Sequence, residues 1–312
     1  MKAFVLPRRG AAAVEPSDVE VPRIGADELL VRVQAIGVGI HDSRFLPGDA
    51  RYPYPIGIEA AGSIEELGSA VDHHALGDRV AFISSMQPRG GTWAEFAAVS
   101  SASTIQPLPA GMDFVQAAAV PVAGTTAVKA LSAVGSPPAG GDLFVAGGSG
   151  AIGTFAIQLA RRQGWRVAAS ASVDNHGYLR SLGVEETVDY RDPRWRERVM
   201  DWMPAGVSAA IAIQPGTTAE SLPVVREGAS VVSVSGDPLI PGHGVRTTGL
   251  PYQLDVREEL GALMAHIASS ALHLEIERVH PFDEALAALA KVQTRRARGK
   301  IVISMNPAVP FG

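Results

Sequence analysis

The feature that most constrains this chain is a glycine-rich hexapeptide near its middle. Gly148, Gly150 and Gly153 follow the pattern G-x-G-x-x-G, after a short apolar stretch at 143–146 and before a helical pattern over 151–162. In this setting the first glycine permits a tight turn, the second lets backbone N–H groups approach a pyrophosphate, and the third lets helix and strand pack closely. The motif predicts a dinucleotide-binding loop made of Gly148, Ser149, Gly150, Ala151, Ile152 and Gly153. The alternative is a glycine-rich turn that binds nothing.

The pattern around this loop changes near residue 118. Before it, short strand-like stretches alternate with turns, which indicates a compact β-barrel-like unit. After it, apolar strands alternate with helical stretches, which is typical of a parallel sheet covered by helices. The strands are expected at 143–146, 166–169, 187–189, 209–213 and 230–234, and the helices at 151–162, 174–182, 194–202 and from Asp255 to about 269. The tail from 272 has a strand–helix–strand pattern that fits either unit.

Composition excludes several classes of protein. A length of 312 residues suggests two domains. The absence of cysteine excludes disulfides, cysteine zinc sites, iron–sulfur clusters and thiol nucleophiles. A net charge of −5 argues against a nucleic-acid partner. We find no signal peptide and no stretch that would span a membrane, so we expect a cytoplasmic protein.

The choice of dinucleotide depends on the end of the second strand. An NAD site places an acidic residue about 20 positions after the loop, where it binds the ribose 2′-OH. Residues 168–172 contain no acid, and Asp174 is better explained as a helix cap. We therefore favour NADPH, with Ser170 and Ser172 as donors to the 2′-phosphate and Arg180 and Arg191 as cationic partners; NADH remains possible. The two serines also fit as small residues at a strand end.

Further segments, in order along the chain, resemble the medium-chain dehydrogenase/reductases, and specifically their zinc-free quinone oxidoreductase (zeta-crystallin-like) branch. The resemblance spans nearly the whole chain. It rests on the segments Ala35-Ile36-Gly37-Val38, Pro55 to Gly62 (PIGIEAAG), Gly77-Asp78-Arg79-Val80, Gly90 to Phe96 (GGTWAEF), Ala117 to Ala127 (AAAVPVAGTTA) and Gly299-Lys300-Ile301-Val302.

This resemblance implies an α/β protein with a GroES-like β-barrel catalytic domain and a Rossmann domain with a doubly wound parallel sheet. The implied catalytic domain comprises residues 1–117 and 271–312, and the Rossmann domain residues 118–270. It also implies a homodimer and an active site in the cleft between the domains. Zinc-dependent relatives hold metal at the positions of Gly39, Ile58 and Val122, which carry no metal-binding group here. We therefore expect no metal site.

The resemblance also assigns candidate residues near the reaction. Tyr52 and His41 are the candidate proton donors, although each also fits as an ordinary loop residue. Asp42 is expected to brace its loop or contact the cofactor, and Glu59 to be structural. The remaining candidates for cofactor contact are Thr126, Tyr190 with Arg191, and Lys300. The branch often has asparagine at position 39 and lysine at position 175, whereas this chain has Gly39 and Asn175.

Without metal, cysteine or a flavin motif, the chemistry has to come from the nicotinamide. We expect zinc-independent, NADPH-dependent hydride transfer to a small quinone or α,β-unsaturated carbonyl substrate. Two alternatives remain open: an enoyl-thioester reductase of the same fold, and a nucleotide-binding protein without turnover.

Overall fold

The computed structural model describes residues 1–84 and 87–306. Its contacts divide the chain into two compact units. The first contains Met1–Val122, Arg257–Ala271 and the segment from Ile276 onward, and the second contains Ala123–Val256 and Leu272–Glu275.

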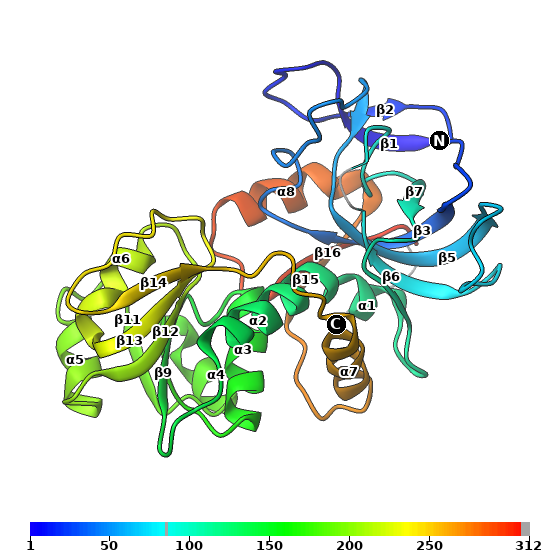
Figure 1. Cartoon of the computed structure of the whole chain (residues 1–312). Helices are drawn as coiled ribbons and strands as arrows, with labels where there is room; N and C mark the ends of the chain where they lie inside the picture. Colours follow the sequence, from blue (N-terminus) through cyan, green and yellow to red (C-terminus); the bar gives the residue numbers. More distant parts are fainter. Residues whose placement is uncertain (85–86, 307–312) are drawn as a thin grey trace. The chain divides into compact units, whose positions relative to one another are not determined.

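The first unit is built mainly from β-strands (Figure 1). One sheet has seven strands, in the order β15-β16-β3-β5-β6-β8 with β7 paired to β3, and a second sheet has the order β2-β1-β4. The long strand β3 pairs with β5, β7 and β16 and so connects the larger sheet. The strands are β1 (Lys2–Leu6), β2 (Glu15–Asp18), β3 (Glu28–Val38), β4 (Tyr54–Pro55), β5 (Glu59–Leu67), β6 (Arg79–Ile83), β7 (Phe96–Ser100), β8 (Ile105–Pro107), β15 (Ile276–Pro281) and β16 (Lys300–Ser304).

Helices flank this β-structure. The helices are α1 (Phe114–Ala118), α7 (Arg257–Ala268) and α8 (Ala285–Gln293), with the 3-10 turn η3 (Phe282–Glu284) before α8. Helix α1 begins with a capping box, in which Asp113 accepts from the Gln116 N–H and the Gln116 side chain accepts from the Asp113 N–H. The core buries Ile36, Phe82 and Trp93 completely, each at 0% exposure.

Helix α7 belongs to the first unit by its contacts, whereas the sequence placed it in the nucleotide-binding domain. The Gln106 side chain on β8 donates to the Arg257 carbonyl at 2.7 Å, which fixes the start of α7 against that strand. The sequence could not indicate this bond because its partners lie 151 positions apart. The predicted domain boundaries at 117 and 270 remain a prediction.

The second unit is a six-stranded parallel sheet in the order β11-β10-β9-β12-β13-β14. The strand order reverses between β9 and β12, which defines a topological switch point. Figure 1 shows α3 and α4 on one side of this sheet and α5 on the other. The strands are β9 (Asp142–Ala146), β10 (Arg166–Ala171), β11 (Glu186–Asp189), β12 (Val207–Ala212), β13 (Val225–Ser233) and β14 (Arg246–Gly249). The helices are α2 (Pro121–Val134), which begins in the first unit, α3 (Ala151–Arg162), η1 (Val173–Asn175), α4 (His176–Ser181), α5 (Trp195–Trp202), α6 (Thr217–Ser221) and η2 (Leu222–Val224).

In the part of the chain that the structure describes, no helix is long and apolar enough to cross a membrane.

Candidate functional site

The glycine loop connects β9 to α3 and is held by the neighbouring strand β10. Gly147 has φ +95°, a conformation that favours glycine. The Gly148 N–H donates to the Ser170 carbonyl at 2.9 Å, and the Gly147 N–H donates to Ser170 Oγ at 3.2 Å. Ser170 therefore braces the loop from the end of β10. At the other end, a β-carbon on Gly153 would lie 2.5 Å from the Gly147 oxygen, so helix and loop touch through bare backbone.

Gly150, the second glycine of the motif, has no close neighbours where a side chain would begin. A β-carbon on Gly150 would meet only the Gly147 oxygen, at 3.9 Å, so the protein itself leaves this space open. Gly150 is the N-cap of α3, makes no side-chain cap, and is followed by a first turn without acidic residues. The first backbone N–H groups of a helix have no partner within the helix and attract anions. These features fit the pyrophosphate of a dinucleotide.

The end of β10 carries the residues predicted to distinguish NADPH from NADH. Ser172 follows the strand and accepts from the Asn175 side chain at 3.0 Å. Arg180 donates to Thr187 at 2.8 Å. Arg191 lies over the exposed ring of Tyr190, and its charge also interacts with Asp174 in the turn after β10. A guanidinium group therefore lies near this turn, where the strand ends without an acid.

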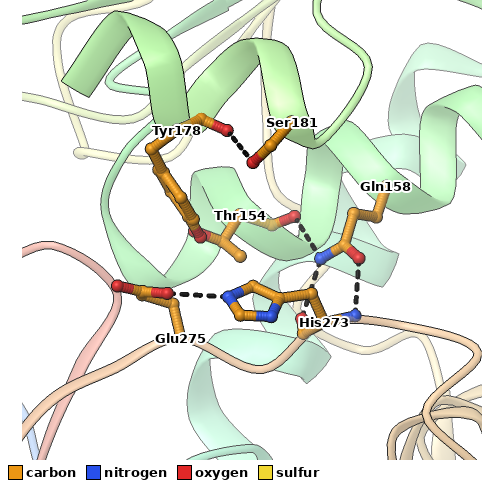
Figure 2. A network of polar contacts seen from close by, with 6 residues as sticks. All are labelled: Thr154, Gln158, Tyr178, Ser181, His273 and Glu275. Carbon is orange, nitrogen blue, oxygen red and sulfur yellow. Dashed lines mark hydrogen bonds and ion pairs between the residues drawn. The ribbon is translucent and has the colours of Figure 1, made fainter.

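A polar network in the second unit joins α3, α4 and the 272–275 segment (Figure 2). The Gln158 side chain donates to the His273 carbonyl at 2.9 Å and accepts from the His273 N–H at 2.8 Å. Thr154 Oγ1 lies 2.9 Å from the Tyr178 hydroxyl, and His273 Nε2 lies 2.7 Å from Glu275 Oε2. The network fixes this short segment to the helix that begins at the glycine loop. The sequence did not indicate it, because no spacing relates position 158 to 273.

The predicted proton donors lie in the first unit, in the loop between β3 and β4. The His41 ring stacks on Phe45 with centroids 4.3 Å apart, and Phe45 is half exposed. Burial lowers the pKa of His41, and the charges of Arg295 and Arg44 lower it further. The imidazolium form, which is the stronger acid, is therefore scarce at neutral pH. Tyr52 is half-buried and packs at the edge of the core.

Asp42, next to His41, is buried at 1% exposure. Its Oδ2 accepts from the Gly39 N–H at 2.9 Å and from Trp93 Nε1–H at 3.0 Å. Burial raises the pKa of Asp42 to about 7, and the Glu59 charge raises it, while these hydrogen bonds and the Lys300 charge lower it. Asp42 therefore holds the Gly39 backbone and the Trp93 indole together, and its expected contact with the cofactor remains a prediction. Trp93, which the sequence analysis did not single out, is its partner.

The raised pKa of Asp42 predicts how the free energy of unfolding depends on pH. Because the folded pKa lies above the unfolded value of 3.8, folding stability falls as pH rises from about 4 to about 7. Asp42→Asn removes the buried charge and keeps an acceptor for Gly39 and Trp93. We expect Asp42→Asn to raise the free energy of unfolding by about 2 kcal/mol at pH 8 and to leave it nearly unchanged at pH 4.5. Chemical denaturation at both pH values measures this difference, and an equal effect at the two values would contradict it.

Lys300 is buried rather than open to a ligand. Its ammonium group pairs with Glu59, and both side chains are almost inaccessible. The other Glu59 oxygen accepts from the Val122 N–H at 2.7 Å. The pair therefore connects β16, β5 and the start of α2. Thr126 lies half-buried on α2. The cofactor roles assigned to Lys300 and Thr126 remain predictions.

Within residues 1–84 and 87–306, no three carboxylate or imidazole side chains gather closely enough to hold a metal ion.

Comparison with known proteins identifies the family. Residues 25–110 match the alcohol dehydrogenase GroES-like domain, and residues 182–303 match a zinc-binding dehydrogenase domain. The chain is 30% identical to an Arabidopsis thaliana protein named NADPH-dependent alkenal/one oxidoreductase, over 98% of this chain and 80% of that one. It is 28% identical to the trans-enoyl reductase tazE of Aspergillus terreus, over 77% and 86% of the two chains.

A solved structure agrees with these sequence relatives. The quinone oxidoreductase from Coxiella burnetii superimposes with a TM-score of 0.87 at 28% identity, covering 98% of this chain and 99% of that one. The chain therefore belongs to the medium-chain dehydrogenase/reductase superfamily, in its quinone oxidoreductase branch. The predicted architecture, a GroES-like unit and a Rossmann unit, is confirmed.

Proposed function

We propose that this oxidoreductase uses NADPH to reduce the conjugated double bond of an enone or to reduce a quinone. A nicotinamide cofactor follows from the family and the nucleotide-binding fold. The observation that carries the proposal is the loop around Gly150, which is open to a pyrophosphate at the start of α3. Relatives named an alkenal/one oxidoreductase and a quinone oxidoreductase support these acceptor classes.

The preference for NADPH rests on the end of β10. The strand is followed by Ser172 instead of an acid, and Arg191 lies near the same turn. A hydroxyl and a guanidinium group favour a 2′-phosphate, whereas a carboxylate would repel it. When bound, the reduced nicotinamide supplies a hydride. In the second unit, the protein's part is to bind and orient the cofactor through the α3 N-terminus and the residues after β10.

The first unit supplies the groups expected to contact the acceptor. Tyr52 and the His41–Phe45 stack lie on one loop and present aromatic surface to a planar conjugated molecule. Reduction at carbon leaves negative charge on the acceptor's oxygen, which then needs a proton. Tyr52 and His41 remain proposed donors, although His41 is mostly neutral at pH 7.

Enoyl thioesters are a second candidate acceptor class. A trans-enoyl reductase, 86% of which this chain covers, is among the relatives. The reaction at carbon would be the same, because a thioester conjugates with its double bond as a ketone does.

The acceptor classes can be separated with purified protein treated with EDTA. We would follow NADPH oxidation against cyclohex-2-enone, para-benzoquinone and crotonyl-coenzyme A. We expect turnover with at least one of the first two acceptors without added metal. Turnover of crotonyl-coenzyme A alone would favour the thioester assignment. Cofactor binding without oxidation of NADPH by any acceptor would contradict an enzymatic role.

The NADPH preference predicts the effect of Ser172→Asp. A carboxylate at this position would accept a hydrogen bond from a ribose 2′-OH and would repel a 2′-phosphate. We expect the Kd for NADPH to rise by about 10-fold or more, and the Kd for NADH to fall. Titration of cofactor fluorescence measures both constants. Ser181→Asp, on the exposed end of α4, is the matched control and should change neither. If Ser172→Asp weakened the binding of NADPH and of NADH by the same factor, the proposed contact between Ser172 and the 2′-phosphate would be contradicted.

The homodimer and the cytoplasmic location also remain proposals. The edge strand β14 and the exposed side chains of Leu239, Ile240 and Tyr252 near it support a contact with a second copy.

A further inference from the structure

Asp237 connects the two segments that follow the neighbouring strands β12 and β13. Its Oδ1 accepts from the Gly216 N–H at 3.0 Å, and its Oδ2 accepts from the Thr218 N–H at 3.2 Å. The Thr218 hydroxyl in turn donates to Ser233 Oγ, at the end of β13, at 3.0 Å. Both oxygens of the Asp237 carboxylate therefore hold the segment after β12 against the segment after β13.

The segment after β12 also touches the glycine loop. The Gln214 side chain lies against Gly147, because a β-carbon on Gly147 would lie only 3.0 Å from Gln214 Cγ. Thr217 donates to the Gln214 carbonyl through its hydroxyl at 2.5 Å and through its N–H at 3.1 Å. The residues that Asp237 holds, on either side of Thr217, therefore lead through one turn of the chain to the loop expected to bind the pyrophosphate.

The sheet topology indicates which part of a dinucleotide is expected at these segments. In an open parallel sheet, a dinucleotide binds outside the carboxyl ends of the strands, across the point where the strand order reverses. That point lies between β9 and β12. The residues that recognise the 2′-group of the adenosine ribose follow β10, on one side of this point. The nicotinamide half is therefore expected on the other side, at the ends of β12 and β13 that Asp237 connects.

We propose that Asp237 is a positioning residue, which fixes the segments where the nicotinamide half of NADPH binds. It acts through the backbone of Gly216 and Thr218 rather than by contact with the reacting atoms. This inference rests on the proposed use of NADPH by this oxidoreductase. It goes beyond that function because it assigns the orientation of the hydride donor to a residue that the sequence analysis did not single out.

The charge of Asp237 suits this role. Burial raises the pKa of its carboxyl group, but the hydrogen bonds that the group accepts outweigh burial and leave the pKa below its usual value. The group is therefore a carboxylate at neutral pH, and a carboxylate accepts from backbone N–H groups more strongly than a neutral oxygen does. An asparagine could accept from only one of the two N–H groups, because its amide nitrogen is a donor. Asp237→Asn is thus expected to weaken the connection while keeping the shape of the side chain.

The test measures catalysis and, separately, the binding of the adenosine half of the cofactor. Adenosine 2′,5′-bisphosphate is the probe, because it carries that half alone. We expect Asp237→Ala to lower kcat with cyclohex-2-enone by about 10- to 100-fold, since a small misplacement of the nicotinamide slows hydride transfer. The Kd for adenosine 2′,5′-bisphosphate should stay unchanged. Asp237→Asn, and Ser233→Ala, which removes the acceptor of the Thr218 hydroxyl, should show the same pattern with a smaller loss of kcat.

Two comparisons separate this role from a structural one. Asp78→Ala is the matched control, because Asp78 is an exposed aspartate of the first unit that accepts from the Ala75 N–H at 2.8 Å; it should change neither quantity. Ser172→Asp should weaken the binding of adenosine 2′,5′-bisphosphate, which would show that the probe reports the adenosine half. If Asp237→Ala weakens the binding of the bisphosphate and of NADPH by the same factor, or leaves kcat unchanged, the proposal is wrong.

A readout independent of turnover uses the fluorescence of bound NADPH, which depends on how firmly the nicotinamide ring is held. At saturating NADPH, Asp237→Ala should show weaker nicotinamide fluorescence than wild type and Asp78→Ala. Equal fluorescence in the three proteins would overturn the positioning role. Absence of enone and quinone turnover in wild type, with the fluorescence difference present, would overturn the proposed function while leaving the positioning of the nicotinamide by Asp237 supported.

Discussion

Gly153→Ala is expected to weaken NADPH binding by about 100-fold, equivalent to about 2.7 kcal/mol. The added methyl group would lie 2.5 Å from the Gly147 oxygen and 2.6 Å from the Gly148 oxygen. Because both contacts are with backbone atoms, helix α3 has to move away from the glycine loop that precedes it. Some dinucleotide-binding fingerprints accept alanine at this position, but the helix lies too close to the loop here.

The control for this variant is another helical glycine in the same unit. A β-carbon on Gly177, in α4, would meet nothing within 4 Å. Gly177→Ala should therefore bind NADPH like wild type and gain up to about 1 kcal/mol of stability from helix propensity. Titration with NADPH, accompanied by thermal unfolding of each variant, measures both effects. Wild-type affinity in Gly153→Ala would show that the loop does not hold the pyrophosphate.

Lys300→Met is expected to lower the free energy of unfolding by about 3–5 kcal/mol. The change leaves the Glu59 carboxylate buried at 1% exposure without its cation. Breaking a buried pair on one side costs more than the pair itself contributes, because the remaining charge stays desolvated. The variant also tests whether Lys300 is structural, as its burial indicates, or contacts the cofactor, as the family resemblance implied.

Two further variants check the cause of this loss. Lys300→Met combined with Glu59→Gln should recover most of the stability, because no uncompensated charge remains. Arg32→Met removes one side of an exposed pair with Glu65 and should cause no measurable change. Urea unfolding of the four proteins provides the comparison. If the double variant were no more stable than Lys300→Met, the loss would come from packing and not from the charge.

The second unit could be predicted well from the sequence because its signals are local. The helix expected at 151–162 has the same bounds in the structure, since a glycine turn precedes it and an apolar face runs along it. The expected strands and helices after it lie within a few residues of β10 to β13 and α4 to α5. Strand β14 was missed, because Arg246–Gly249 carries no apolar pattern and is a strand only through pairing with β13.

The candidate site was harder to predict because its contacts are long-range. Asp42 was singled out, but its partner Trp93 is 51 positions away. Lys300 was assigned from a family motif, whereas its position depends on Glu59, 241 residues earlier. Ser170 was predicted as a donor to the 2′-phosphate, and the structure shows its hydroxyl oxygen accepting from the Gly147 N–H. No periodicity or spacing encodes these pairs, since they exist only after the sheets have formed.

The most direct test of the central claim follows the hydride itself. NADPH carrying deuterium at the transferred position of C4 would be incubated with the protein and cyclohex-2-enone, and the product analysed by NMR. The account predicts cyclohexanone with one deuterium at the former β-carbon, formed in the presence of EDTA. NADPH oxidation with no deuterium on that carbon, or no oxidation with enone or quinone, would contradict it.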